Sequence, residues 1–186
     1  TVEIGTGEKA IKIGGENVFP LYSFDAPIEN APKVGVEITD MGFENACAGI
    51  KDYYAGCATI ADMAKKASEM EGADFVALSL EGGDPKEVAA AVDCPLVVEG
   101  SKNVEKDGEL LTKVAEALQG KNAVVMPAKE ENYKAVGAAA GLAYDQIVGC
   151  ESAVDINLAK QLNVMTTKLG VKSESIIMNV GTATVG

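Results

Sequence analysis

The segment FVALSLEGGDPKEVAAAVDCPLVVEG, residues 75–100, holds the unit from which most of the chain is built. Its first apolar run, at 75–80, predicts a strand, and a second run at 94–99 predicts the next one. Between them Asp84 suits the N-cap of a helix, Pro85 its first position and Glu87 a reciprocal cap. The segment therefore predicts a strand, a helix and a second strand.

The same unit recurs along the chain from Lys33 onward. We expect further strands at 34–38, 123–126, 147–150 and 175–179 and further helices at 60–70, 110–118, 133–144 and 158–169. Glycines follow three of these helices and suit their C-terminal caps. Short, apolar, β-branched strands that alternate with helices are typical of a parallel sheet covered on both faces.

Two closures of such a sheet are possible, a doubly wound open sheet or a barrel. The first strand-to-helix turn, at 39–43, lacks the G-x-G-x-x-G pattern of a dinucleotide fold. Residues 2–4 and 10–13 flank a glycine turn, and the hairpin that they predict would plug the floor of a barrel. We therefore predict an α/β chain of the TIM (β/α)8 barrel class, in one domain at 1–186 with a hairpin and lead-in at 1–32. A complete barrel takes roughly 250 residues, so about six units are expected here and the last two beyond Gly186.

Charge excludes several classes of partner. The chain of 186 residues has 28 acidic and 16 basic side chains, a formal charge of -12. Such a surface repels nucleic acid and anionic lipid. No apolar run approaches the roughly 20 residues of a membrane helix. We expect a soluble, cytoplasmic protein that binds neither nucleic acid nor membrane.

Histidine is absent, which excludes imidazole acid–base catalysis and imidazole metal ligands for this chain. The four cysteines, Cys47, Cys57, Cys94 and Cys150, form no C-x-x-C pattern. Their spacing indicates neither a zinc site nor an iron–sulfur cluster. We expect four reduced and mostly buried thiols.

Polar residues at the carboxyl ends of the strands are the candidate site residues, because barrels carry their function there. Asp40 and Glu81 follow adjacent strands and would form a carboxylate pair, or else two solvated loop carboxylates. The Ser101–Asn103 segment offers donors to the barrel mouth or, alternatively, caps the next helix.

Two further candidates follow later strands. Lys129 has the position of a Schiff-base lysine, but its neighbours Glu130 and Glu131 favour an ordinary charged side chain. The glycine- and threonine-rich stretch 179–186 would let a flat ligand approach the backbone, or is simply a flexible loop.

Four stretches are more specific than the barrel pattern: 2–17, 103–107, 129–134 and 155–163. With them the whole chain resembles the small subunit of the corrinoid/iron–sulfur protein of the acetyl-CoA (Wood–Ljungdahl) pathway, whose archaeal relative belongs to acetyl-CoA decarbonylase/synthase. The resemblance covers only the earlier part of a family member. It implies a TIM barrel that pairs as a heterodimer with a large subunit bearing the iron–sulfur cluster and the corrinoid. One departure is the charged segment 99–103, where the resemblance implies a more neutral loop.

The resemblance implies a non-catalytic subunit that shields a corrinoid (cobalamin) bound mainly by its partner. The resemblance further implies that a separate methyltransferase passes the methyl group from methyltetrahydrofolate to the cobalt of the corrinoid, from which acetyl-CoA synthase/CO dehydrogenase receives it. From strand-end position alone, the residues expected near the cofactor are Asn103, Met126, Ser152, Asn179 and Thr182. Two alternatives stay open: a pterin-dependent methyltransferase that uses Asp40 and Asn179, and a barrel lyase that uses Lys129.

Overall fold

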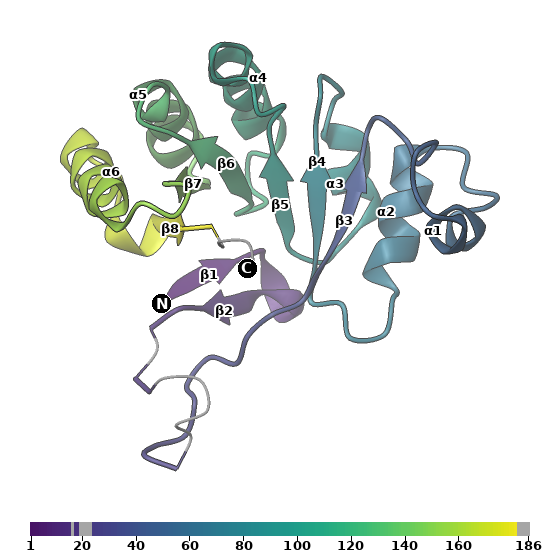
Figure 1. Ribbon diagram of the computed structural model, residues 1–186, viewed down its shortest axis with the longest axis horizontal. Coiled ribbons are helices and arrows are strands. Elements are labelled where there is room, and N and C mark those ends of the chain that lie inside the picture. The colour runs from purple at the N-terminus through teal and green to yellow at the C-terminus, as the bar shows by residue number, and fades with distance from the viewer. Residues whose placement is uncertain (16, 19–23, 182–186) are drawn as a thin grey trace.

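The computed structural model describes residues 1–15, 17–18 and 24–181. An antiparallel hairpin opens the chain, with β1 (Val2–Ile4), the 3-10 turn η1 (Gly7–Lys9) and β2 (Ile11–Ile13). The main sheet has six parallel strands in sequence order (Figure 1). They are β3 (Gly35–Thr39), β4 (Phe75–Ser79), β5 (Leu96–Glu99), β6 (Val124–Ala128), β7 (Ile147–Glu151) and β8 (Ile176–Asn179).

Helices connect successive strands and lie along the outer face of the curved sheet (Figure 1). They are α1 (Ala48–Tyr53), α2 (Ile60–Ser68), α3 (Lys86–Ala91), α4 (Val104–Ala117), α5 (Tyr133–Val136) with the π-helical η2 (Gly137–Ala143), and α6 (Ile156–Leu169). The 3-10 turn η3 (Ser173–Ser175) precedes β8. Every predicted strand is present within two residues of its expected start. The hairpin prediction is confirmed, α3 begins one residue later than expected, and α1 was missed.

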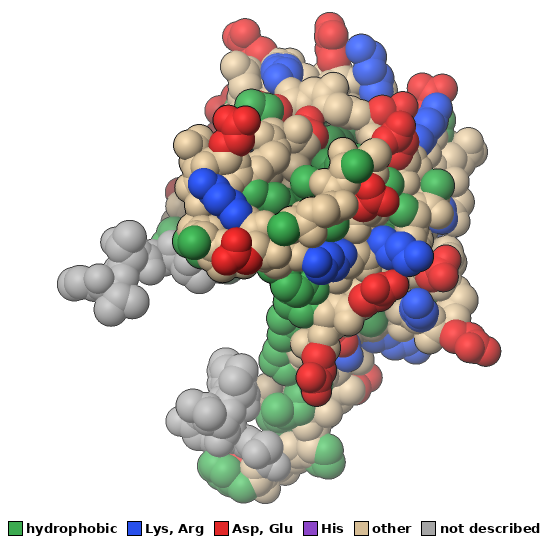
Figure 2. All heavy atoms as spheres, turned by 90° about the vertical axis from the view of Figure 1, so that its right-hand side faces the viewer, with side chains coloured by type: hydrophobic (Ala, Val, Ile, Leu, Met, Phe, Trp, Pro, Cys, Tyr) green, Lys and Arg blue, Asp and Glu red, His purple; other side chains and the backbone are tan. Residues whose placement is uncertain are grey.

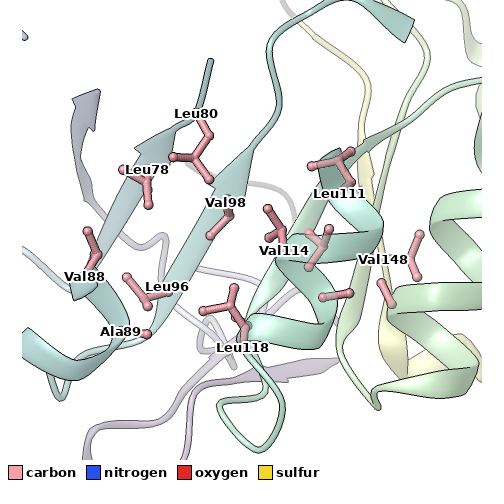
Figure 3. Close-up of a cluster of buried hydrophobic side chains, with 14 of the residues drawn as sticks. Leu78, Leu80, Val88, Ala89, Leu96, Val98, Leu111, Val114, Leu118 and Val148 are labelled. Carbon is pink, nitrogen blue, oxygen red and sulfur yellow. The ribbon is translucent and has the colours of Figure 1, made fainter. Parts of the chain in front are cut away.

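The largest apolar core lies between the sheet and these helices. Val76, Leu78, Val98, Val125 and Val148 contribute from the strands and are each fully buried. Figure 3 shows how Leu111 and Val114 of α4, with Leu118 at its C-cap, project into this core beside Val98. Alternate strand residues point to one face, so the helices of the chain cover the outer face of the central strands, while Val36 and Met178 at the edges are only partly buried.

A second, smaller apolar cluster lies on the opposite, inner face. Val2 and Ile4 of the hairpin pack there against Val124 and Ile147. The side chain of Asn122, just before β6, donates hydrogen bonds to the backbone oxygens of Glu3 and Gly5 at 2.8 and 3.1 Å. The hairpin is thereby fixed to the amino ends of the strands, where a barrel floor would be.

The inner face is only partly covered. A cavity of about 330 Å³ remains between the hairpin, the lead-in at 30–33 and the strands, with Phe75, Val97 and Ile177 among its walls. Viewed from the β3 side, the molecule is hollowed between its body and the lead-in, with hydrophobic side chains at the back of the hollow (Figure 2). Within the described ranges no helix is long and apolar enough to cross a membrane.

Candidate functional site at the carboxyl ends of the strands

The inner face changes character along the strands. Near the hairpin it is apolar, because Val97, Val124, Met126 and Ile177 pack around the β1–β2 strands. Two residues further along, the same face carries Glu99 of β5, Glu151 of β7 and Asn179 of β8, since side chains alternate with a period of two. The mouth of the sheet is therefore a polar layer above an apolar one.

An ion pair lies in this polar layer. The Lys129 ammonium lies 3.1 Å from Oε1 of Glu151, and both side chains are largely buried. Burial raises the pKa of Glu99; Lys102 lowers it, Glu37 and Glu151 raise it further, and Lys129 lowers it. The three glutamates come from alternate strands β3, β5 and β7, so the mouth is acidic with one lysine neutralising part of its charge.

Lys129 forms an ion pair, but with another partner than the neighbouring glutamates that the sequence indicated. In the part of the chain that the structure describes, it pairs with Glu151 and with neither Glu130 nor Glu131. The register between β6 and β7 shifts at Val125–Ala128, which changes where the end of β6 stands relative to β7.

Asp40 and Glu81 are neighbours without forming a carboxylate pair. The Asp40 carboxylate accepts hydrogen bonds from the backbone N–H groups of Glu81, Gly82 and Gly83 at 2.9, 3.1 and 2.8 Å. The Glu81 carboxylate instead lies 3.9 Å from the Lys106 ammonium. Asp40 therefore holds the loop after β4, which is a structural role.

The Ser101–Asn103 segment caps α4, which confirms one of its two predicted roles. Asn103 is the N-cap, and its side-chain oxygen accepts from the backbone N–H of Lys106 at 3.2 Å. Ser101 donates to the buried Asp107 carboxylate through its backbone N–H at 2.7 Å and through its hydroxyl at 2.8 Å. Gly100 is required here, because a Cβ would stand 2.7 Å from that carboxylate.

The predicted cofactor residues do not share one environment. Met126 and Asn179 lie on the inner face, and the Asn179 side-chain oxygen accepts from the backbone N–H of Gly181 at 3.0 Å. Asn103 is exposed. Ser152 is 1 % exposed, and its hydroxyl has no hydrogen-bond partner among the described residues. Thr182, with the rest of 182–186, lies outside the described residues.

The cysteines correct one expectation. All four are free thiols, but Cys150 alone is buried, Cys57 and Cys94 are half-buried, and Cys47 is exposed. They were expected to be mostly buried. Cys47 is exposed because it forms the N-cap of α1, a helix with no buried residue. Across the described ranges, no three or more Cys, Asp or Glu side chains gather in an arrangement that would hold a metal ion.

The chain was also compared with known proteins. The family described as CO dehydrogenase/acetyl-CoA synthase delta subunit matches it over residues 1–186. Acetyl-CoA decarbonylase/synthase complex subunit delta 1 of Methanosarcina thermophila is 33 % identical over 98 % of this chain and 45 % of its own length. The delta subunit of Methanothermobacter thermautotrophicus is 32 % identical over 100 % of the chain and 51 % of its own length. That of Archaeoglobus fulgidus is 32 % identical over 98 % and 44 %.

The chain thus spans about half the length of the curated relatives that it matches. The match reaches from the hairpin through the polar mouth to β8, so it includes every residue of the candidate site. The chain belongs to the family of CO dehydrogenase/acetyl-CoA synthase delta subunits.

Proposed function

We propose that this chain is part of the small subunit of a corrinoid/iron–sulfur methyl carrier. In this proposal it pairs, in the cytoplasm, with a large subunit that holds the iron–sulfur cluster and the corrinoid, and it shields that corrinoid. A separate methyltransferase loads the methyl group from methyltetrahydrofolate, and acetyl-CoA synthase with CO dehydrogenase receives it. The family match over residues 1–186 is the observation that carries the proposal.

The proposed fold of the whole subunit is a closed TIM barrel. Its six described strands run parallel in sequence order, whereas the order of a doubly wound sheet reverses at a switch point. The edges of β3 and β8 are unpaired in the described sheet, and the inner apolar layer is partly open. The relatives are about twice as long as this chain, which leaves enough sequence for two further units to pair with both edges.

The residues at the mouth fit a corrinoid that another subunit holds. A corrin ring has an apolar body and a rim of primary amides, and Met126 with Asn179 presents an apolar and a polar side chain on one face. The carboxylates of Glu99 and Glu151 are suited to accept hydrogen bonds from rim amides. The chain has no histidine, so it offers no imidazole to the cobalt. When bound, the corrinoid supplies the metal that carries the methyl group; this chain would orient the ring and exclude water.

The mouth gives less support to a pterin-dependent methyltransferase or a lyase. Asp40 would have to pair with a pterin edge, but its carboxylate already accepts three backbone hydrogen bonds. The side-chain oxygen of Asn179 is likewise engaged, by Gly181. Lys129, the lyase candidate, forms an ion pair with Glu151.

Anaerobic purification of the tagged, full-length protein from its own cells tests the proposal. We expect a larger partner to co-purify, and the complex to show the visible absorption of a corrinoid and an iron–sulfur cluster. A colourless protein without that partner would overturn the proposal. A complex that forms normally but loses its corrinoid when Glu99 and Glu151 are both changed to Gln would assign the contact to the mouth.

A further inference from the structure

We propose that the cleft between α3 and α4 is a binding site for a small amphipathic anion, a carboxylate or phosphate ester with an apolar body. The cleft has a volume of about 540 Å³, within the range of small-molecule sites. It lies on the outer, helical side of the sheet and reaches the loop after β4 that Asp40 holds. The inference does not depend on the proposed function.

The cleft belongs to the middle of the sheet. Its walls come from α3, α4 and the loop after β4, all of which serve strands β4 to β6 in the middle of the sheet. Additional units would pair with β3 or β8, at the edges. The cleft stays open because α3 has six residues and α4 has fourteen, so the later turns of α4 have no helix of equal length beside them.

Apolar side chains form the depth of the cleft. Leu110, Val114 and Ala117 line it from α4, and Pro85 lines it from the start of α3. Val114 also packs into the core below (Figure 3). Leu110 and Ala117 are each half-buried, which leaves apolar surface available to a ligand.

Lysines are arranged along the axis of the cleft, although the chain carries only 16 basic residues against 28 acidic ones. Lys106, Leu110, Lys113 and Ala117 are spaced i, i+4, i+7 and i+11, so they form one stripe of α4. Lys86 faces this stripe from α3. Lys106 is paired with Glu81, but Lys86 and Lys113 form no ion pair with any residue that the structure describes.

The acidic residues of the cleft lie further out. Glu109 and Glu116 also line it, but at about 100° per residue they stand roughly 60° and 80° around α4 from Lys106, and roughly 40° and 60° from Lys113. They are displaced away from the buried side that carries Leu111, Val114 and Leu118. Asp84 accepts a hydrogen bond from the backbone N–H of Lys86 at 2.9 Å. Two unpaired ammonium groups thus remain to meet an anion whose apolar part rests on Leu110 and Ala117.

The test titrates the intact, isotope-labelled chain with 1-naphthyl phosphate and follows the backbone amide signals. Two matched probes separate the parts of the ligand: 1-naphthol has the body without the anion, and inorganic phosphate has the anion without the body. We expect saturable shifts at residues of α3 and α4 with naphthyl phosphate, and binding at least roughly tenfold weaker with either matched probe.

Variants locate the site and its charges. Lys86→Gln and Lys113→Gln should each weaken naphthyl phosphate binding by roughly three- to tenfold, whereas Lys160→Gln, an exposed lysine of α6, leaves it unchanged. Ala117→Phe fills the cleft without changing its charge and should abolish binding.

Three results would overturn the inference. In the first, Lys86→Gln and Lys113→Gln bind naphthyl phosphate as tightly as the unchanged chain does. In the second, the amide signals that shift are confined to the inner face near Phe75 and Met126. In the third, no probe binds. In the last case, protection of α3 and α4 on assembly with partner subunits would assign the cleft to protein docking instead.

Discussion

The two faces of the same sheet differ in how completely the chain covers them. On the outer face Val76, Val98, Val125 and Val148 are fully buried under the helices. On the inner face Val97, Met126 and Ile177 are only half-buried, and glutamates follow them at the mouth. Helices of the described chain cover most of the outer face, while the inner face stays partly open. The comparison teaches that buried apolar contacts, and with them most of the stability, lie on the helical side, and that the inner face keeps surface available for contacts.

The largest expected effect is on the free energy of unfolding, and it differs between two adjacent valines of β5. Val98→Ala removes two fully buried methyl groups from the outer core and should lower the free energy of unfolding by about 2–3 kcal/mol. Val97→Ala makes the same chemical change on the half-open inner face and should cost about 1 kcal/mol or less, because much of its surface already contacts solvent. Urea denaturation of both variants measures the difference.

If the two variants lost equal amounts of unfolding free energy, the outer and inner faces would not differ in burial as described. The contrast becomes sharper if the full-length subunit is measured as well. If further units cover the inner face, Val97→Ala should become as costly there as Val98→Ala.

A smaller effect concerns the mouth. Asp40→Ala removes the acceptor of three backbone hydrogen bonds in the loop after β4 and should cost about 1–2 kcal/mol, since exposed N–H groups find water in exchange. Asp93→Ala, at an exposed loop position, is the matched control and should change little. Amide hydrogen exchange should accelerate at Glu81–Gly83 in the Asp40 variant; unchanged exchange there would show that Asp40 does not hold this loop.

The smallest effect is a pH dependence at Glu99. Burial raises the pKa of this carboxyl, so the folded state binds its proton more tightly than the unfolded state does. As pH rises through the carboxyl range and up to the raised pKa, the wild-type chain loses stability from this group. Glu99→Gln should therefore stabilise the chain at neutral pH, and the gain should vanish below the ordinary glutamate pKa. Thermal unfolding at two pH values checks this against Glu130→Gln, an exposed control; a gain independent of pH would contradict the cause.

The regular elements were largely predictable, because apolar runs define strands and local groups define helix ends. Asn103 at the N-cap of α4 and Gly170 at the C-cap of α6, where φ is 112°, were both readable from the sequence. Helix α1 was missed because Ala48–Tyr53 buries no residue and so shows no apolar period. The sequence predicts a helix at 133–144, but its run of alanine and glycine does not show that Gly137–Ala143 is π-helical and not α-helical.

The polar layer of the mouth was only partly predictable. Strand ends gave Asn179 and Met126. The sequence also placed Glu99 at the end of a strand, but not among the residues expected near the cofactor. The available signal was the period of two along each strand, because alternate residues share a face. It places Glu99 on the face of Val97, and Glu151 on the face of Ile147 and Gly149. The pairing of Lys129 with Glu151 was not accessible from sequence, because it depends on the register shift between β6 and β7.

The central claim is that the inward-facing mouth covers a corrinoid held by another subunit and does not itself catalyse methyl transfer. The most direct measurement incubates the purified full-length subunit, free of its partners, with methyltetrahydrofolate and cob(I)alamin and follows methylcobalamin by its visible spectrum. We predict no methylcobalamin above the level without protein and no tight binding of methyltetrahydrofolate. Catalytic formation of methylcobalamin, lost on Asp40→Ala or Asn179→Ala, would contradict the account and identify the protein as a methyltransferase.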